Sequence, residues 1–281
     1  MHEARPALLL ALLVLAGCAS AGGSDALPPA GSAEWTLSWS DEFEGADGSL
    51  PDPVKWTPVV TGNGGGNQEL QYYTDRPSNV HVENGMLVIT GRRETYTGPD
   101  GTREYTSARL STAAGFQQVY GRFEARMKLP RGQGVWPAFW LLGQNLPQVG
   151  WPACGEIDIM ENVGFEPATV HGTIHGPGFS GADGISASYS LASGKFADAF
   201  HQFAAEWEPG QIRFYVDGTL YATRTPADLP AGAQWAQDGH PFWIILNLAL
   251  GGSWPGSPDA TTTFPQDLLV DYVRVYARPA R

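Results

Sequence analysis

The sequence predicts an all-β fold, either a sandwich or a barrel, and three observations lead to this prediction. Between about Trp35 and Ala277, strand-like runs recur at short spacing and no convincing amphipathic helix appears. The 35 glycines and 22 prolines supply turn formers between those runs. No internal repeat period is visible, which disfavours a propeller or a solenoid. Many short strands joined by Gly/Pro turns are typical of two-sheet sandwiches and barrels.

The composition limits the class of protein further. All-β domains of roughly 200–250 residues are common, so a chain of 281 residues can bury one large core. Disorder is excluded because 11% of the residues are aromatic and only 16% are charged. The 17 Lys and Arg against 29 Asp and Glu give a formal charge of -12. An acidic surface cannot neutralise phosphates, so we expect no nucleic-acid partner.

The amino-terminal part is expected to be an export signal and a tether. Residues 1–17 contain an apolar run from Ala7 to about Ala16, which is too short to span a bilayer and fits a signal peptide. The run ends in Leu-Ala-Gly-Cys, which resembles the bacterial lipoprotein box and implies lipidation of Cys18. The alternative is an ordinary signal peptide. Residues 18–33 read as a flexible tether and residues 34–281 as the folded domain.

This arrangement predicts where the protein acts and what its second cysteine does. A lipidated Cys18 would place the protein on the bacterial cell envelope, with the membrane contacted only through the anchor. Without the anchor, the protein would be secreted. Cys154 would then be the remaining thiol, so no intramolecular disulfide is expected. We expect Cys154 to be a small buried packing residue.

The strands of the folded domain can be justified in chain order. Residues 85–90 (GMLVIT) form a β-branched apolar run, and residues 121–128 alternate polar and apolar side chains. Residues 135–142 (VWPAFWLL) form a continuous apolar run of the kind found in a buried strand. Residues 211–216 and 219–223 flank Asp217-Gly218, a pair that predicts a tight hairpin because its turn needs positive φ. Residues 242–250 and 268–277 complete the set.

The chemistry is concentrated in residues 154–164, CGEIDIMENVG. Strand alternation places Glu156 and Asp158 on one face and the two intervening isoleucines in the core. Glu161 is five residues after Glu156, so a regular strand would turn it to the opposite face. One bulged residue near Met160 would bring Glu161 beside the other two acids and let Met160 pack inward. The sequence therefore predicts three carboxylates in a row on a bent strand.

Three interpretations of this acidic row are possible. Glycoside hydrolases use a pair of carboxyl groups, of which one acts as nucleophile and the other as proton donor. Three carboxylates can also bind calcium. A solvated acidic strand without function is the third interpretation. Catalysis is favoured because the acids lie in an apolar strand beside Trp and Gly/Pro turns, where aromatic rings can stack on sugar faces.

The segment GEIDIMENVG resembles the active-site strand of glycoside hydrolase family 16 in its bulged E-x-D-x-x-E form. Further resembling stretches are GNQELQYYTDRPSNV at 66–80, SARLST at 107–112, GRFEARMKLPRGQGVWPAFWLLG at 121–143, VHGTIHGPGFSG at 170–181, ILNLALGGSWPG at 245–256 and DYVRVY at 271–276. Together they are similar to bacterial laminarinases, the endo-β-1,3-glucanases of that family. The resemblance implies a β-jelly-roll sandwich of two antiparallel sheets with an open concave cleft, and no catalytic cofactor.

The resemblance also implies a role for each acid in a retaining, double-displacement reaction. Glu156 would be the nucleophile, Glu161 the general acid and then base, and Asp158 the assistant between them. A retaining enzyme needs its two carboxyl groups roughly 5–5.5 Å apart, so the side chains must lean together. An acid beside an ionised glutamate must hold its proton, so the pKa of Glu161 should be raised.

Other positions are expected to bind substrate or metal. Trp136 and Trp140 are four residues apart and share a strand face, and His175 lies four residues after His171 on the same strand face. The predicted substrate-binding residues are Trp136, Trp140, Trp151, His175, Asn67, Arg109 and Trp254. The family also implies a structural calcium far from the cleft, with Glu42, Gly85 and Asp271 at the matching positions and backbone oxygens contributing.

Several functional alternatives stay open at this point. Mixed-linkage β-1,3-1,4-glucan is the next substrate within the same fold, and a transglycosylase would use the same covalent intermediate. A non-catalytic glucan-binding lipoprotein is the alternative from another class. It would tolerate loss of one acid, whereas all three acids are present here. Nothing in the sequence suggests more than a monomer.

Overall fold

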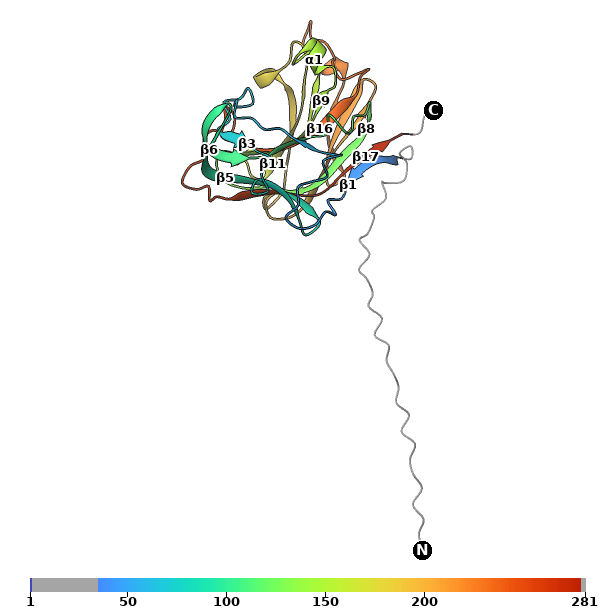
Figure 1. The fold of residues 1–281 in the computed structure, drawn as a ribbon. Helices are drawn as coiled ribbons and strands as arrows, with labels where there is room; N and C mark the ends of the chain where they lie inside the picture. Colours follow the sequence, from blue (N-terminus) through green and yellow to red (C-terminus); the bar gives the residue numbers. More distant parts are fainter. Residues whose placement is uncertain (2–34, 279–281) are drawn as a thin grey trace. The chain divides into compact units, whose positions relative to one another are not determined.

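The chain folds into two packed β-sheets, as a computed structural model that describes Met1 and residues 35–278 shows (Figure 1). Within the described residues, helix is confined to one turn, α1 (Leu146–Val149), and two 3-10 turns, η1 (Gly181–Asp183) and η2 (Pro226–Asp228). Among these residues, no helix is long and apolar enough to cross a membrane. The predicted signal peptide, Cys18 and tether lie outside the described residues.

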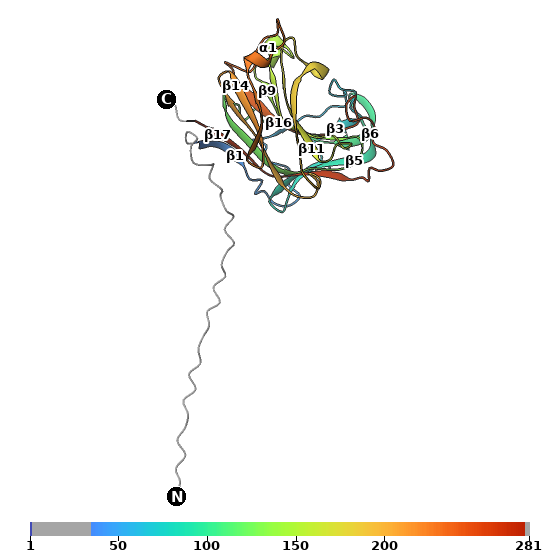
Figure 2. The same ribbon diagram turned by 180° about the vertical axis from the view of Figure 1, so that it is seen from behind.

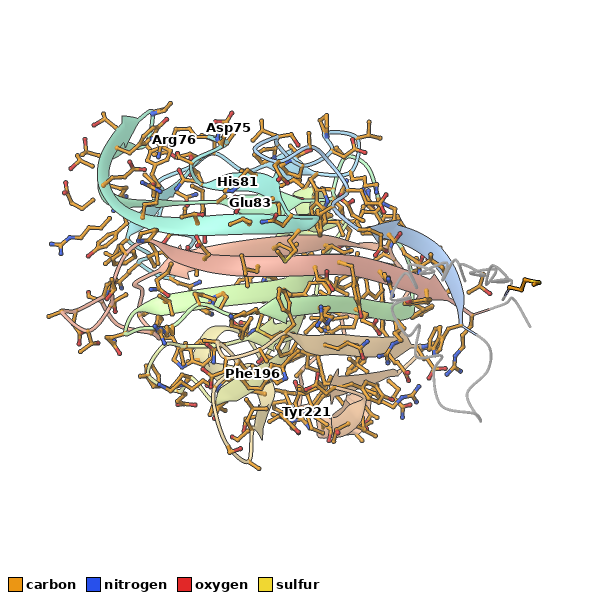
Figure 3. The ribbon with its side chains drawn as sticks, turned by 90° about the horizontal axis from the view of Figure 1, so that it is seen from below. Asp75, Arg76, His81, Glu83, Phe196 and Tyr221 are labelled. Carbon is orange, nitrogen blue, oxygen red and sulfur yellow. The ribbon has the colours of Figure 1, made fainter. Side chains whose placement is uncertain are left out.

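The larger sheet has ten strands in the order β15-β14-β13-β8-β17-β5-β6-β3, with β1 paired to β17 and β4 paired to β5. These strands are β1 (Thr36–Asp41), β3 (Gln71–Tyr73), β4 (Val80–Glu83), β5 (Met86–Gly98), β6 (Gly101–Ser107), β8 (Gly121–Lys128), β13 (His201–Glu208), β14 (Gln211–Val216), β15 (Thr219–Arg224) and β17 (Gln266–Ala277). Figure 3 views this sheet from below, with His81 and Glu83 of β4 toward one margin and Tyr221 of β15 toward the other.

The smaller sheet has seven strands in the order β12-β11-β10-β9-β16-β7-β2. Its strands are β2 (Thr57–Pro58), β7 (Arg109–Ser111), β9 (Val135–Gly143), β10 (Glu156–Glu161), β11 (Thr169–His175), β12 (Ile185–Ser190) and β16 (Phe242–Leu250). All of its pairings are antiparallel. Turning the molecule by 180° shows the same two layers from behind (Figure 2).

The hydrophobic core lies between the sheets and explains why the strands alternate. Phe123, Phe203 and Trp207 of the larger sheet are fully buried, as are Phe139 and Leu246 of the smaller one. Each strand therefore contributes every second side chain to the core and leaves the others on an outer face. The outer face of the smaller sheet carries the acids, and we call it the acid-bearing face.

The structure confirms the predicted sandwich and most of the predicted strand limits. Residues 121–128, 211–216 and 242–250 coincide with β8, β14 and β16. The Asp217-Gly218 turn has φ of 48° and 76°, the two positive values that the hairpin needs. One expectation was too simple, because β3 pairs with β6 in parallel and the larger sheet is therefore not wholly antiparallel. The long β5 also runs beyond the predicted residues 85–90.

Candidate active site

The acidic strand β10 lies in the middle of the smaller sheet, between β9 and β11. Glu156 pairs with Leu142 and Asp158 with Trp140, but Met160 then pairs with Phe139, so Ile159 is an extra residue. The pairing with β11 shifts in the same interval. This is the predicted bulge, and it has the predicted effect. Ile159 and Met160 are both buried in the core, and Glu161 returns to the acid-bearing face.

Burial raises the pKa of all three acids, and the charges of neighbouring acids raise it further for Glu156 and Glu161. Burial is the largest cause of the raised pKa of Glu161, which lies well above its usual range, and the charges of Asp158 and Glu156 add to it. Burial and then the charge of Asp158 raise the pKa of Glu156 to about 8. Burial raises the pKa of Asp158 to about 7, against a hydrogen bond with Glu156 that lowers it. Burial therefore favours the protonated form of each acid in the row.

Glu156 and Glu161 each accept a hydrogen bond from an indole N–H. Trp136 Nε1 donates to Glu161 Oε1 at 3.0 Å, and Trp151 Nε1 donates to Glu156 Oε2 at 2.9 Å. Both bonds favour the ionised carboxylate and lower the pKa of its group. These tryptophans were predicted as sugar-stacking residues. The structure gives them a further role, because their polar edges fix where the acids point.

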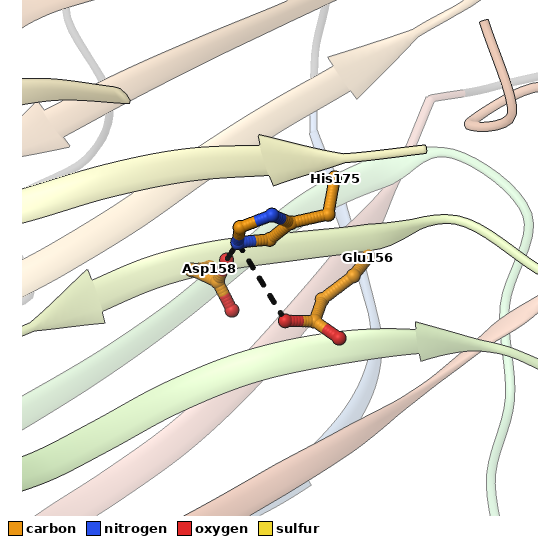
Figure 4. Close-up of side chains that lie close together, drawn as sticks. All are labelled: Glu156, Asp158 and His175. Atoms are coloured by element: carbon orange, nitrogen blue, oxygen red, sulfur yellow. Dashed lines mark ion pairs between the residues drawn. The ribbon is translucent and has the colours of Figure 1, made fainter. Parts of the chain in front are cut away.

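His175 completes the acidic row from the neighbouring strand β11. Its Nε2 lies 3.1 Å from Asp158 Oδ2 and 3.9 Å from Glu156 Oε1 (Figure 4). The side chain is buried, with a tilted ring contact to Trp151 at 6.1 Å. The imidazole lowers the pKa of Glu156, so it favours the ionised form of that acid. His175 therefore lies beside two acids of the row.

Glu156, Asp158 and His175 are also the one group in the described part of the chain whose donor atoms lie close enough to hold a metal ion, within 4.8 Å of one another. Two carboxylates and an imidazole form a donor set suited to a transition metal rather than to calcium, which prefers oxygen ligands alone. The calcium interpretation of the acidic row, which needed three carboxylates, is therefore not what the geometry offers.

The remaining predicted binding residues lie on the β9 side of the row. Trp140 Nε1 donates to Asn247 Oδ1 at 2.8 Å, and the Arg109 guanidinium lies 4.7 Å from the Trp140 ring centre. Arg109 Nε is buried with no hydrogen-bond partner within the described residues. Arg109 thus stacks on an aromatic ring instead of pairing with a surface acid, and it keeps a free donor.

Asn67 and Trp254 belong to two loops that meet at this face. The backbone oxygen of Asn67 accepts hydrogen bonds from the backbone N–H of Ser253 at 2.8 Å and from its hydroxyl at 3.0 Å. Trp254 is 37% exposed, and its ring meets Trp136 edge-on at 5.5 Å. It also contacts the ring of His171 at 5.1 Å. Trp254 therefore stands beside Glu161, between strands β9 and β11.

Sequence reasoning missed a polar network behind Trp140. Asn247 Nδ2 donates to Tyr73 Oη at 3.2 Å, and Tyr73 Oη donates to Glu69 Oε2 at 3.1 Å. Gln71 Nε2 reaches the same oxygen of Glu69 at 2.7 Å. All four side chains are buried. The sequence does contain a signal for this network. Asn247 is the one polar side chain in the apolar run 242–250, and the polar residues Glu69, Gln71 and Tyr73 occupy every second position of their segment.

The positions implied for calcium are not arranged as a side-chain calcium site. Both carboxylate oxygens of Glu42 accept hydrogen bonds from Arg274 at 3.0 Å. Asp271 Oδ2 accepts from Arg126 at 2.6 Å. Gly85 occupies the turn between β4 and β5 with φ of 70°. As placed, these side chains do not fit a calcium ion, because arginines already neutralise both carboxylates.

Cys154 is a free cysteine with a fully buried side chain, as expected of a packing residue. Burial, followed by the charge of Glu156, raises the pKa of its thiol to about 11. A thiol that stays protonated is a poor nucleophile. Cys154 therefore supports the fold beside the acidic row and takes no part in its chemistry.

Comparison with known proteins gives one consistent result. The sequence profile of glycosyl hydrolases family 16 matches residues 67–274. The chain is 45% identical to a beta-glucanase of Rhodothermus marinus over 286 aligned residues, 97% of this chain and 94% of that protein. Among solved structures, the laminarinase catalytic domain of Thermotoga maritima is 48% identical with a TM-score of 0.81, over 86% of this chain and 98% of that one. The endo-β-1,3-glucanase of Pyrococcus furiosus is 50% identical with a TM-score of 0.83, over 89% and 97%.

Proposed function

Because the chain belongs to glycosyl hydrolases family 16, we propose that it is an endo-hydrolase of β-1,3-glucan that acts with retention at the anomeric carbon. Similarity to laminarinases and an endo-β-1,3-glucanase over most of the chain supports this substrate. The mixed-linkage, transglycosylase and binding-protein alternatives are not favoured. The observation that carries the proposal is the bulge at Ile159, which puts Glu156 and Glu161 on one face.

In the first step, Glu161 is the proton donor and Glu156 the nucleophile. The Glu156 carboxylate forms a bond to the anomeric carbon while the bond from that carbon to the glycosidic oxygen breaks. The proton of Glu161 passes to that oxygen, and the leaving sugar departs as an alcohol. The raised pKa of Glu161 supports this assignment because burial and the charges of Asp158 and Glu156 favour its protonated form. Trp136 then stabilises the carboxylate that forms.

In the second step, Glu161 is the base. It takes a proton from water, the water oxygen bonds to the anomeric carbon, and the Glu156 carboxylate is released. Glu156 must be ionised before each cycle, and its hydrogen bond with Asp158 offers a place for the proton. Asp158 assists in this way, and His175 at 3.1 Å stabilises its negative charge before the proton arrives.

The first test measures new reducing ends and product sizes from laminarin, lichenan, carboxymethyl-cellulose and agarose. We expect laminarin to be cleaved to mixed short oligosaccharides and Glu156→Ser to lose at least a thousandfold in kcat. Glu83→Ser is the matched control, since Glu83 is exposed on β4 of the other sheet. Binding of laminarin without cleavage of any polymer would show a glucan-binding protein instead.

The proposal extends to the amino-terminal segment. The protein is exported with residues 1–17 as signal peptide, and a lipid on Cys18 anchors it to the cell envelope as a monomer on the tether 18–33. The apolar run before Leu-Ala-Gly-Cys supports this. Detergent-phase partitioning and mass spectrometry of the amino-terminal peptide test it. An unmodified Cys18 in the expressing bacterium would contradict the anchor, and the Cys18→Ala variant is the control.

A structural calcium is the remaining part of the proposal. Glu44 and Asp52 line the same hollow as Glu42 and support cation binding there, whereas Asp41 is already paired with Lys55 at 3.1 Å. Because arginines hold the side chains of Glu42 and Asp271, backbone oxygens would have to supply most ligands. Millimolar calcium should raise the Tm by several degrees and EDTA should reverse the rise. An unchanged Tm would contradict the proposed calcium site.

A further inference from the structure

Three donor atoms lie close together at one end of the acidic row (Figure 4). They are one carboxylate oxygen of Glu156, one of Asp158 and a ring nitrogen of His175, all within 4.8 Å of one another. Glu161, whose Oε1 accepts a hydrogen bond from Trp136, does not belong to this group. The donor group is therefore a distinct part of the row.

The separations within this group match those of ligands around a small dication. Zn²⁺ binds imidazole nitrogen and carboxylate oxygen at about 2.0–2.2 Å, so neighbouring ligands of a tetrahedral ion lie roughly 3.4 Å apart. His175 Nε2 lies 3.1 Å from Asp158 Oδ2 and 3.9 Å from Glu156 Oε1. The two distances fall on either side of the tetrahedral value, so shifts of about half an ångström are enough to complete the site.

Asp158 Oδ2 distinguishes this group from an ordinary cluster of acids. Asp158 is 3% exposed, and its Oδ2 is buried with no hydrogen-bond partner within the described residues. The oxygen lies beside His175 Nε2, yet the two atoms form an ion pair without a hydrogen bond. A buried carboxylate oxygen without a hydrogen bond is costly, and a cation bound at this point would satisfy it.

Charge and hydrogen bonding also prepare Glu156 to be a metal ligand. Burial and then the charge of Asp158 raise the pKa of Glu156, because two buried carboxylates repel each other. A dication bound to both would neutralise them. Trp151 Nε1 donates to Glu156 Oε2, which orients the carboxyl group and leaves Oε1 toward His175. Hydrogen bonds of this kind to the outer side of a ligand support metal sites in general.

We propose that Glu156, Asp158 and His175 bind Zn²⁺ or a similar transition-metal dication, and that the bound ion inhibits the enzyme reversibly. The binding site rests on the geometry, whereas the inhibition rests on the proposed function. The ion occupies Glu156 Oε1, so this carboxylate cannot form its bond to the anomeric carbon. Binding forms coordination bonds and releases the protons that the donors carry, and no group is oxidised or reduced. The imidazole ligand selects a transition metal over Ca²⁺ and Mg²⁺, which prefer oxygen ligands alone.

The first experiment measures binding without any substrate. Calorimetric titration of the purified protein, without a histidine tag, with ZnCl2 should show a site that depends on His175. His175→Gln should raise the Kd at least about tenfold, because it removes one of three ligands. His201→Gln is the matched control and should leave the Kd unchanged, since His201 Nδ1 on β13 faces the single carboxylate of Asp217 at 2.7 Å. Equal binding by His175→Gln and the wild type would overturn the inference.

Two further variants keep the test decisive if His175→Gln does not fold by circular dichroism. Asp158→Asn should weaken Zn²⁺ binding to a similar extent, because it removes another ligand. Glu161→Gln removes a neighbouring negative charge but no ligand, so it should weaken binding much less. The inference is overturned if Glu161→Gln and Asp158→Asn weaken binding equally, because the ion would then be held by charge alone.

The second experiment measures inhibition of laminarin cleavage. Zn²⁺ at about ten times its Kd should raise the apparent KM roughly tenfold and leave kcat unchanged, since metal and substrate compete for Glu156. EDTA should restore the original KM, and the same concentration of Ca²⁺ or Mg²⁺ should leave it unchanged. A fall in kcat at constant KM would show that Zn²⁺ acts elsewhere and would overturn the inhibitory role.

Failure of this inference and failure of the proposed function give different results. If the wild type binds Zn²⁺ through His175 but cleaves no laminarin, the proposed function is wrong and the metal site stands. If the wild type cleaves laminarin but does not bind Zn²⁺, the proposed function stands and the metal site is wrong.

Discussion

At the scale of single residues, each of the two glutamates accepts a hydrogen bond from an indole donor of its own. Trp151 favours the ionised form of Glu156, as does the nearby His175. Trp136 does the same for Glu161, but burial and two neighbouring acids outweigh it. Each glutamate thus keeps a raised pKa, and its indole donor lowers that pKa in opposition to burial.

Removing either indole N–H should move one limb of the pH–rate profile. The acidic limb requires ionised Glu156, so Trp151→Phe raises the pKa of that group and moves the limb to higher pH. The basic limb requires protonated Glu161, so Trp136→Phe moves that limb to higher pH as well. A hydrogen bond worth about 1 kcal/mol corresponds to a displacement of roughly 0.7 pH units. The measurement is kcat/KM against pH.

Trp39→Phe is the control for this pair of variants, because Trp39 lies on β1 of the other sheet. Its profile should match that of the wild type. Movement of the same limb in both Trp136→Phe and Trp151→Phe would contradict the separate assignment of acid and nucleophile.

The residues that sequence alone identified are those that lie close together in the chain. Glu156, Asp158 and Glu161 fall within six positions, so alternation and one bulge were enough to place them. Asn247 could not be placed in this way, because its bond to Trp140 depends on the pairing of β16 with β9. Likewise, the contact of His171 with Trp254 depends on how a distant loop folds back.

At the scale of elements, the bulge in β10 is the feature on which the site depends. Ile159 is the one residue that lets both Asp158 and Glu161 face outward. Its loss would restore regular alternation and turn Glu161 toward the core, where a carboxyl group without a partner is costly.

Deletion of Ile159 should therefore abolish glucan cleavage and lower the Tm by more than 10 °C, since several kcal/mol corresponds to roughly that change in a domain of this size. The milder Ile159→Val removes one buried methylene group, costs about 0.5–1.5 kcal/mol and should keep activity within twofold. Thermal unfolding and laminarin cleavage measure both. A deletion variant with wild-type Tm and activity would show that the bulge is dispensable.

Elements with strong local signals were predicted well, and those defined by distant partners were not. The Asp217-Gly218 hairpin and the apolar strand β16 were readable because turn chemistry and hydrophobicity are local. The parallel pairing of β3 with β6 carries no local signal. A strand of three residues is too short to indicate which strand it pairs with or in which direction.

At the scale of the whole molecule, the acidic row costs stability. The folded-state pKa of Glu156 is about 8, above its usual value near 4.5, so folding favours the protonated form. The contribution of this group to stability is therefore fully present below about pH 4.5 and is lost as the pH rises through about 8. A site arranged for chemistry is thus least compatible with the fold under alkaline conditions.

Glu156→Gln should stabilise the inactive protein in a pH-dependent way. The neutral amide avoids burying a charge, so the Tm should rise by several degrees at pH 8 and by much less at pH 5. Glu83→Gln, at an exposed position on β4, should leave the Tm unchanged at both values. Equal Tm gains for Glu156→Gln at pH 5 and pH 8 would show that the carboxyl does not titrate with a raised pKa in the folded protein.

The sheet order itself was beyond the sequence. Composition and turn chemistry predicted a sandwich, and the family resemblance implied its jelly-roll form, but the ten-stranded and seven-stranded orders arise from long-range pairings such as β8 with β17. Such pairings are selected by the packing of both sheets at once. The acidic row lies on an interior strand of the smaller sheet because of these long-range pairings.

The exposed edge of β12 has a further consequence for solubility. An edge strand with small uncharged side chains is a template on which another chain can add a strand. In this molecule, Arg224 of β15 reaches across and donates to the backbone oxygen of Ser186 at 2.7 Å. This places a positive charge and a filled acceptor at the free margin. The protein can therefore keep a serine-lined edge strand exposed while discouraging edge-to-edge aggregation with its own copies.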